Sequence, residues 1–437
     1  MAGQRGTRPG GWFDHRVNDN VDAGPGPHPV RLRPWHFILT FGIVSLLADM
    51  VYEGARSIIG PYLATLGASA TVVGIAAGAG EFIGYGLRVV SGYLVRRSRR
   101  YWTWTILGYL LTVISVPMIG ATGVMAPALI LYGTERLGKA VRSPAKDTLL
   151  SHASTATGRG RAFGVHQAMD QLGAVLGPLL LAGVLSLRVG DYRLAFAVLA
   201  VPGVLVVVIL FWLRARVPNP VAYEAVEQAP PAPESGRPTV RALDRPARAI
   251  LPAQFWRYVA TIAVLSCGVA SFPLLTFHAQ TRGLLTEAQI PILFALAMLV
   301  DGMSGLVMGW VYDRRGPHVL VMVPIAASAA AIAFASNARL VWVGVAIWGI
   351  VNGVLDSTVK AVVTELVEPD SRAVAFGWLA FVRGIGLLLA GAVLGLGYDH
   401  SPALVVWLIL GANAVALPGL AWALHGMRLT RTPRTRA

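Results

Sequence analysis

The chain has 437 residues, of which 55% are hydrophobic and 14% charged, and its formal net charge is +15. This apolar content exceeds the roughly one half that is typical of a soluble domain, which favours a protein embedded in lipid. The arginines lie in short connections between apolar segments and not on one folded basic domain. We therefore predict the lipid bilayer as a partner and no nucleic acid.

Apolar segments of about 20 residues, enough to cross a hydrocarbon layer of about 30 Å, recur along the chain. In the first half they lie near residues 35–66, 70–94, 101–120, 124–145, 162–187 and 193–214. In the second half they lie near 255–279, 286–311, 318–336, 340–366, 373–397 and 403–425. The pattern predicts an all-α membrane protein with about twelve transmembrane helices in two pseudo-symmetric six-helix bundles, 35–216 and 255–425.

Three segments lack long apolar runs and lie outside the predicted bundles. Residues 1–34 are rich in Gly, Pro and Arg, residues 217–254 carry many prolines and mixed charge, and residues 426–437 are basic. We interpret the first and last as cytoplasmic tails, the first of them disordered, and the middle segment as a cytoplasmic linker.

Positive charge is concentrated in alternate connections and at the chain ends. The connections concerned carry Arg96, Arg97, Arg99, Arg100, Arg159, Arg161, Arg314 and Arg315. The positive-inside rule then places both termini in the cytoplasm, which requires an even number of spans. Arginine greatly outnumbers lysine, as in GC-rich bacterial genomes, so we expect a multi-pass protein of a bacterial cytoplasmic membrane.

The two halves resemble each other in their fifth and eleventh spans. Ala162-Phe163-Gly164 matches Ala375-Phe376-Gly377, and Asp170 then falls opposite Arg383. With the offset changed by one residue, Arg142-Ser143 matches Asp356-Ser357 in the fourth and tenth spans. Weak internal similarity of this kind is expected of transporters built from paired repeats around a site near the membrane midplane.

A glycine and arginine motif closes the eighth span. It reads Gly309-Trp310-Val311-Tyr312-Asp313-Arg314-Arg315-Gly316 and resembles the signature of the major facilitator superfamily, in which such elements latch the two halves on the cytoplasmic side. The first-half copy keeps Gly92 and Arg97 but has Arg96 where the aspartate belongs. The resemblance implies the two-bundle fold of that superfamily, with Gly92, Arg97, Gly309, Asp313, Arg314 and Gly316 at a cytoplasmic gate.

The fifth span contains Gly173-Ala174-Val175-Leu176-Gly177-Pro178. Small residues four apart allow close helix crossing, and proline bends a helix. The run resembles the motif of the antiporter and exporter branches of the same superfamily, although their closing glycine pair is absent. Gly173, Gly177 and Pro178 therefore favour export, and plain helix packing is the alternative explanation.

Charged residues inside the spans carry most of the functional information, because an ionisable group at the bilayer centre costs about 2.5 to 3.5 kcal/mol on insertion scales. Asp49, Glu53 and Arg56 follow an i, i+4, i+7 spacing on the first span and so share one helix face, and Glu81 lies on the second. A carboxyl group at this depth gains or loses a proton with small changes in water access. Asp49, Glu53 and Glu81 are therefore our candidates for proton coupling.

The remaining intramembrane charges supply candidates for a substrate cavity. They come from both halves, and they are Arg56, Arg88, Asp170, Asp301, Asn352, Asp356 and Arg383. Nearer the predicted cytoplasmic face, Arg136, Lys139, Arg142 and Lys360 are interpreted as partners that neutralise acids and fix helix packing.

We predict a secondary active transporter that moves a small organic solute by alternating access, through proton-coupled antiport out of the cell. A proton symporter or uniporter for uptake is the nearest alternative, and a receptor or partner protein on the same scaffold is an alternative of another class. The connections contain no phosphate loop, metal-ligand spacing or nucleophile triad. We therefore expect no enzymatic activity, no cofactor and no metal, and we expect a monomer.

Overall fold

The computed structural model describes residues 32–155, 157–220, 223 and 251–427, and within these ranges every regular element is a helix. The prediction of an all-α protein is confirmed for this part of the chain. The predicted tails, 1–34 and 426–437, and the predicted linker, 217–254, lie largely outside the described residues.

The first bundle contains six spans, the last of which is made of two helices in succession. Its elements are α1 (Pro34–Thr65), α2 (Ala70–Ser98), α3 (Tyr101–Thr122), α4 (Met125–Thr155), α5 (Arg159–Leu187), α6 (Tyr192–Val198) and α7 (Ala200–Arg216). Asp191 caps α6, since its carboxylate accepts a hydrogen bond from the Leu194 amide at 2.9 Å.

The second bundle repeats this plan with more interruptions. Its elements are α9 (Ala253–Cys267), α10 (Phe272–Thr281), α11 (Gln289–Arg315), η1 (Pro317–Val321), α12 (Met322–Ala330), η2 (Ala331–Phe334), α13 (Ala338–Leu366), η3 (Pro369–Ser371), α14 (Arg372–His400) and α15 (Pro402–Ala423). Two spans are made of several helices each. One consists of α9 and α10, and the other consists of η1, α12 and η2.

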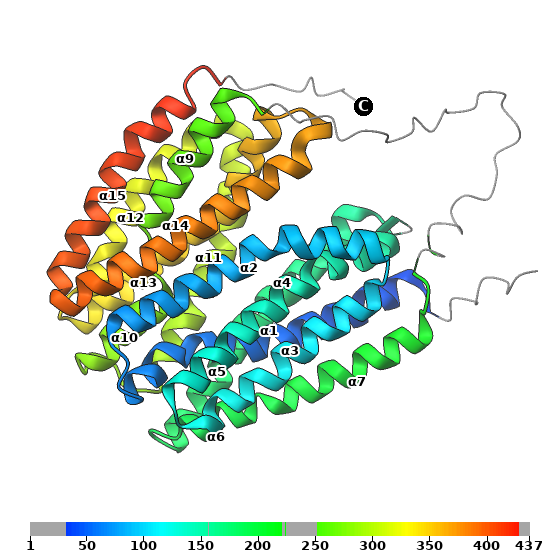
Figure 1. The fold of residues 1–437 in the computed structure, drawn as a ribbon, viewed down its shortest axis with the longest axis horizontal. Helices are drawn as coiled ribbons and strands as arrows, with labels where there is room; N and C mark the ends of the chain where they lie inside the picture. The colour runs from blue at the N-terminus through cyan, green and yellow to red at the C-terminus, as the bar shows by residue number, and fades with distance from the viewer. Residues whose placement is uncertain (1–31, 156, 221–222, 224–250, 428–437) are drawn as a thin grey trace, which may run out of the picture.

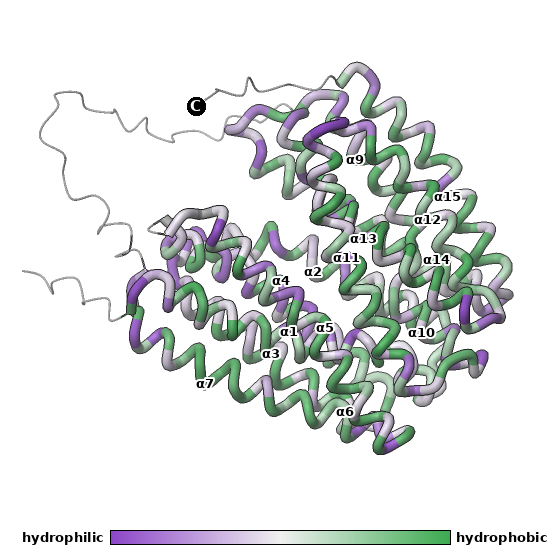
Figure 2. Tube along the Cα trace, turned by 180° about the vertical axis from the view of Figure 1, so that it is seen from behind, coloured by the Kyte–Doolittle hydropathy of each residue, from purple (hydrophilic) through white to green (hydrophobic). Residues whose placement is uncertain are grey.

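Eleven segments of the described chain are long and apolar enough to cross a membrane, and α4 is the remaining long helix. The charges on α4 explain the difference, because it carries Glu135, Arg136, Lys139, Arg142 and Lys146 within three turns. Hydrophobic residues cover the outer helices α7 and α15, whereas hydrophilic residues gather at helix ends and along α4 (Figure 2). Counting α4, the prediction of about twelve spans is confirmed.

The seventh span is broken where a continuous helix was predicted. The apolar run 255–279 is interrupted between Cys267 and Phe272, and Pro273 then begins α10. The carbonyl groups freed by the break are satisfied by side chains: Asn413 Nδ2 donates to Gly268 O at 2.9 Å, and the Trp348 indole donates to Ala270 O at 2.8 Å. Irregular backbone at membrane depth requires such partners.

The two bundles converge at one end and diverge toward the other (Figure 1). We call the end where α1 begins and α15 ends the terminal end, and the opposite end the closed end. The helices α2 and α14 run side by side from the closed end, and α1 packs on α10 while α5 packs on α11. Cross-bundle hydrogen bonds among the described residues lie at the closed end or near mid-depth.

At the closed end, Asp399 of α14 caps the beginning of α2 in the other bundle. Its carboxylate accepts hydrogen bonds from the Ala70 and Thr71 amides at 2.9 and 3.0 Å and from the Thr71 hydroxyl at 2.5 Å. An anion at a helix N-terminus satisfies unpaired amides and interacts favourably with the helix dipole. Nearby, the Gly190 amide donates to Glu287 in a second contact between the bundles.

Close backbone contact accompanies these polar contacts. A Cβ atom added to Gly74 of α2 would overlap the carbonyl oxygen of Gly391 of α14, and the reverse holds for Gly391. Glycine at both positions therefore lets the two helices touch, as small residues do in other membrane helix pairs. Closure at this end depends on backbone contact, the Asp399 cap and the contact of Glu287 with the Gly190 amide, without an ion pair among the described residues.

We expect Asp399→Ala to open the closed end more often, because hydrogen bonds to a charged group contribute about 1.5–3 kcal/mol each. Spin labels at Leu187→Cys and His400→Cys, in a Cys267→Ser background, report the separation of the bundles at this end. The population with separated labels should rise by roughly tenfold. Asp191→Ala, which removes a helix cap within one bundle, is the control, and equal label distances in all proteins would refute the role of Asp399.

Candidate functional site

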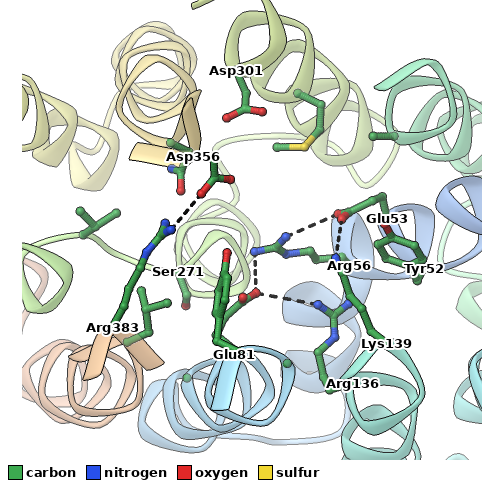
Figure 3. Close-up of a pocket in the computed structure, with 18 of the residues that line it drawn as sticks. Tyr52, Glu53, Arg56, Glu81, Arg136, Lys139, Ser271, Asp301, Asp356 and Arg383 are labelled. Carbon is green, nitrogen blue, oxygen red and sulfur yellow. Dashed lines mark hydrogen bonds and ion pairs between the residues drawn. The ribbon is translucent and has the colours of Figure 1, made fainter. Parts of the chain in front are cut away.

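A polar cavity of about 270 Å³ lies between the two bundles near mid-depth (Figure 3). The first bundle contributes residues from α1, α2, α4 and α5, and the second contributes residues from the broken seventh span and from α11, α13 and α14. The break itself reaches the cavity, since Val269, Ala270 and Ser271 line it. Discontinuous helices at a repeat interface are a common way to build a transport site.

The centre of the first-bundle wall is Arg56 of α1, which bridges two acids. Its guanidinium lies 2.8 Å from Glu81 of α2 and 3.6 Å from Glu53, one turn earlier on α1. The three groups point toward one another in Figure 3. The helical spacing predicted from the sequence explains why Glu53 and Arg56 share a face. Glu81 reaches the same place from α2, since α1 and α2 both pack against α4.

Two bases from α4 complete this network. Arg136 lies 3.8 Å from Glu81 and 2.5 Å from its own neighbour Glu135, and Lys139 lies 3.6 Å from Glu53. Arg136 is 2% exposed, so its charge is held inside the bundle by these acids and by the rings of Tyr52 and Tyr132. Both bases pair with acids, in line with the interpretation that they neutralise acids and fix helix packing, and both also line the cavity.

The second-bundle wall is acidic, with one strong pair. Arg383 of α14 lies 3.0 Å from Asp356 of α13 and 5.2 Å from the centre of the Tyr85 ring on α2. Asp301 of α11 faces the same space (Figure 3). Within the described residues, no base lies within 4 Å of its carboxylate, and one of its oxygens is buried without a hydrogen-bond partner.

A smaller polar cluster lies beside the cavity, between α1, α4 and α5. Lys146 is 3.6 Å from Asp170, which is 3.7 Å from the buried ring of His166. Ser45 contacts both the His166 ring, at 3.3 Å, and Lys146, at 3.4 Å. Asp170 lines the cavity, so this cluster connects it to the interior of the first bundle.

The structure brings together all ten charged or amide residues that the sequence singled out for proton coupling and substrate binding. Every one of them lines the cavity: Asp49, Glu53, Glu81, Arg56, Arg88, Asp170, Asp301, Asn352, Asp356 and Arg383. Sequence reasoning missed Tyr52, Tyr85, Ser271 and Trp348, which also line it. Glycine and proline punctuation near 268–273 was the available signal for Ser271 and the broken span.

The residues expected at a cytoplasmic gate lie at the terminal end. Among the described residues, Gly92, Arg97, Gly309, Asp313, Arg314 and Gly316 make no hydrogen bond or ion pair to the opposite bundle. Arg314 instead lies over the Trp310 ring at 3.5 Å, and Gly316 ends α11 with a φ of 75°. The bundles are therefore not latched at this end in the present conformation.

The glycines of the antiporter-like run pack two helices of the first bundle together. A Cβ atom on Gly173 would overlap the Leu46 carbonyl of α1, and one on Gly177 would overlap the Met50 carbonyl. Pro178 lies inside α5. This crossing holds Asp49 of α1 close to Asp170 of α5. The two glycines thereby fix the positions of two acids that line the cavity, although the glycines themselves do not line it.

The fold and this charged, membrane-embedded cavity define a polytopic carrier made of two repeated bundles, and comparisons with known proteins agree. The profile of the Major Facilitator Superfamily matches residues 41–391, so the chain belongs to this superfamily of membrane transporters. Among the described residues, no group of three or more His, Cys, Asp and Glu side chains is placed to hold a metal ion.

Two relatives and one solved structure illustrate the similarity. An uncharacterised protein of Mycobacterium tuberculosis is 44% identical over 389 residues, which cover 88% of this chain and 92% of the relative. An uncharacterised MFS-type transporter of Methanocaldococcus jannaschii is 24% identical over 375 residues, covering 84% and 89%. The crystal structure of a point mutant of the nucleoside transporter NupG superposes with a TM-score of 0.70 at 12% identity, covering 89% of this chain and 99% of that one, which shows a shared fold.

Replacement of Arg56 should destabilise the protein, because removing one partner of this partly buried ion pair leaves Glu81 without its nearest base. We expect Arg56→Gln to lower the apparent melting temperature of the purified protein. The double variant Arg56→Gln/Glu81→Gln should recover a substantial part of the loss, since it no longer leaves Glu81 short of a base. Arg339→Gln, at an exposed arginine, is the control, and an additive double variant would show that the pair is not coupled.

Proposed function

We propose that this chain is a proton-coupled antiporter that exports a small organic solute by alternating access. The observation that carries the proposal is a set of acids that share a few bases in a cavity closed at one end: Glu53 and Glu81 both contact Arg56. When a shared acid takes up a proton, it releases its base, which then changes the charge that a bound solute meets. Such a network links proton binding to solute binding.

The candidate proton acceptors differ in their surroundings. A proton that reaches Glu81 must displace contacts to Arg56 and Arg136, and one that reaches Glu53 must displace Arg56 and Lys139. Asp49 has no ion pair among the described residues, although it lies on the same face of α1 and lines the cavity. We therefore rank Asp49 first as the group that takes up a proton, with Glu53 and Glu81 transmitting the change to the bases.

Alternating access requires two arrangements of the bundles. The arrangement described here, with contacts at the closed end and none across the gate residues at the terminal end, supports one of them. If the terminal end faces the cytoplasm, as the positive-inside rule predicts, the cavity is loaded from inside the cell. This favours export, as does the run of Gly173, Gly177 and Pro178, while proton symport or uniport for uptake uses the same cavity and is the competing function.

The test uses proteoliposomes of known orientation that contain a pH-sensitive dye. Nucleosides, dipeptides and small organic ions are added from outside, one at a time, while internal pH is followed. We expect one class of solute to drive proton movement in the direction opposite to its own. Movement of a solute without proton movement would replace the antiporter with a uniporter, and movement in the same direction would replace it with a symporter.

Once a transported solute is known, the roles of the three acids can be distinguished by substitution. We expect Asp49→Asn to abolish solute-driven proton flux while leaving exchange of labelled for unlabelled solute measurable, because exchange needs no proton. Glu53→Gln and Glu81→Gln should each reduce both activities.

Asp370→Asn, at an exposed carboxylate outside the cavity, should behave like the unaltered protein. If Asp49→Asn keeps the original rate and pH dependence of proton flux, the assignment of Asp49 is wrong. Unchanged activity of the Glu53 and Glu81 variants would refute their part in the coupling.

A further inference from the structure

We infer that the cavity binds an organic cation whose positive group pairs with Asp301. The inference names the chemical class of the solute and so rests on the proposed function. It follows from the charges and aromatic rings that line the cavity, considered with the partners that each already has.

The charges of the two walls do not balance in the same way. Among the residues that line the cavity, the first bundle contributes four acids, Asp49, Glu53, Glu81 and Asp170, and four bases, Arg56, Arg88, Arg136 and Lys139. The second bundle contributes Asp301 and Asp356 against Arg383 alone. Arg383 lies 3.0 Å from Asp356, so the acid in excess is Asp301.

The backbone of Asp301 packs against α13, and no base among the described residues lies within 4 Å of its carboxylate. Its carbonyl accepts a hydrogen bond from Ser304 at 3.0 Å, and it lies so close to α13 that a Cβ atom on Gly353 would overlap it. Its carboxylate faces the cavity (Figure 3), with one oxygen buried and without a donor. Burying an unpaired charge is costly, so a ligand whose cation approaches the carboxylate from the cavity gains strongly.

An aromatic ring without a cation lies on the same wall. Of the aromatic residues that line the cavity, Tyr85 already has Arg383 and Arg88 over its ring, and Tyr52 has Lys139 at 4.3 Å. Trp348, the other lining aromatic, is 4% exposed and packs on Phe272 at 5.6 Å between ring centres, and no cation lies over its ring among the described residues. It is the ring type that attracts cations best.

Trp348 lies on α13, the helix that packs against α11 beside Asp301. Glycines of α13 fit against α11 here: a Cβ atom on Gly349 would lie 2.6 Å from the Ala297 carbonyl, one turn before Asp301. Trp348 precedes Gly349 in the chain, and its indole is fixed by the hydrogen bond to Ala270. Asn352, one turn further along α13, also lines the cavity and offers a polar group to a hydroxyl or amide of the ligand.

The cavity has room for a small ligand. A volume of about 270 Å³ corresponds to roughly nine water molecules at about 30 Å³ each. A small quaternary or primary ammonium compound fits this space. The unpaired acid favours an ammonium group over a neutral group of the same shape.

The test measures binding to the purified full-length protein in nanodiscs, without any gradient. The probes are small ammonium compounds, each paired with its uncharged carbon isostere, such as choline with 3,3-dimethylbutan-1-ol. Binding is followed by isothermal titration calorimetry and by the rise in apparent melting temperature. We expect at least one ammonium compound to bind saturably and its isostere to bind at least tenfold more weakly.

Variants then locate the site. Asp301→Asn should weaken binding of that ammonium compound by at least tenfold, Asp301→Glu should retain most of it, and Asp370→Asn should leave it unchanged. A correctly folded Asp301→Asn protein with unaltered affinity overturns the inference. So does a panel in which no ammonium compound binds, or in which the isosteres bind as well as the cations.

The binding result is independent of the transport assay. If an ammonium compound binds through Asp301 but drives no proton movement in proteoliposomes, the inference stands and the proposed antiport fails. If a neutral or anionic solute exchanges for protons and no ammonium compound binds, the antiport stands and the inference is overturned.

Discussion

The cost of an unpaired charge inside a membrane governs the arrangement of this protein. The helix α4 carries Glu135, Arg136, Lys139, Arg142 and Lys146, too many charges for an isolated apolar span. It can cross the membrane because acids of α1, α2 and α5 form ion pairs with its bases. The base that has no acid partner among the described residues, Arg142, lies instead over the rings of Tyr52 and Tyr109. The first bundle therefore closes around α4, and the cavity wall is the exposed side of the same network.

Sequence reasoning could find the elements and the faces of the helices but not their partners. Apolar runs fix spans because the bilayer requires them, and the i, i+4, i+7 spacing of Asp49, Glu53 and Arg56 fixes a common face. Which acid pairs with which base depends on how α1, α2 and α4 are rotated about their axes, which no local pattern encodes. The sequence therefore predicts that Arg136 and Lys139 neutralise acids but not that they do so in the cavity wall. The break at Gly268 is not predicted because the flanking residues are apolar on both sides.

Each bundle has an ion pair between its fourth and fifth spans, but the acid and the base stand on opposite helices of the pair in the two bundles. In the first, the fourth and fifth spans are joined by Lys146 on α4 and Asp170 on α5. In the second, the corresponding spans are joined by Asp356 on α13 and Arg383 on α14, so that the acid and base have changed places. The weak sequence repeat, in which Asp170 falls opposite Arg383, reflects this exchange. Pairing between spans four and five is kept, whereas the polarity of the wall that each bundle presents to the cavity differs.

A consequence for the transport cycle follows from where the ion pairs lie. Every ion pair among the described residues joins two groups of the same bundle. The bundles meet through glycine backbones and through hydrogen bonds such as those of Asp399, Glu287 and Gln171. Rocking one bundle against the other then separates no buried ion pair, so the movement avoids the largest electrostatic cost available in the structure. Asp301 is the exception among the cavity acids of the second bundle, since its charge has no partner in its own bundle. A cation bound there removes that exception, and the occupied carrier can then close over a cavity whose second wall is neutral.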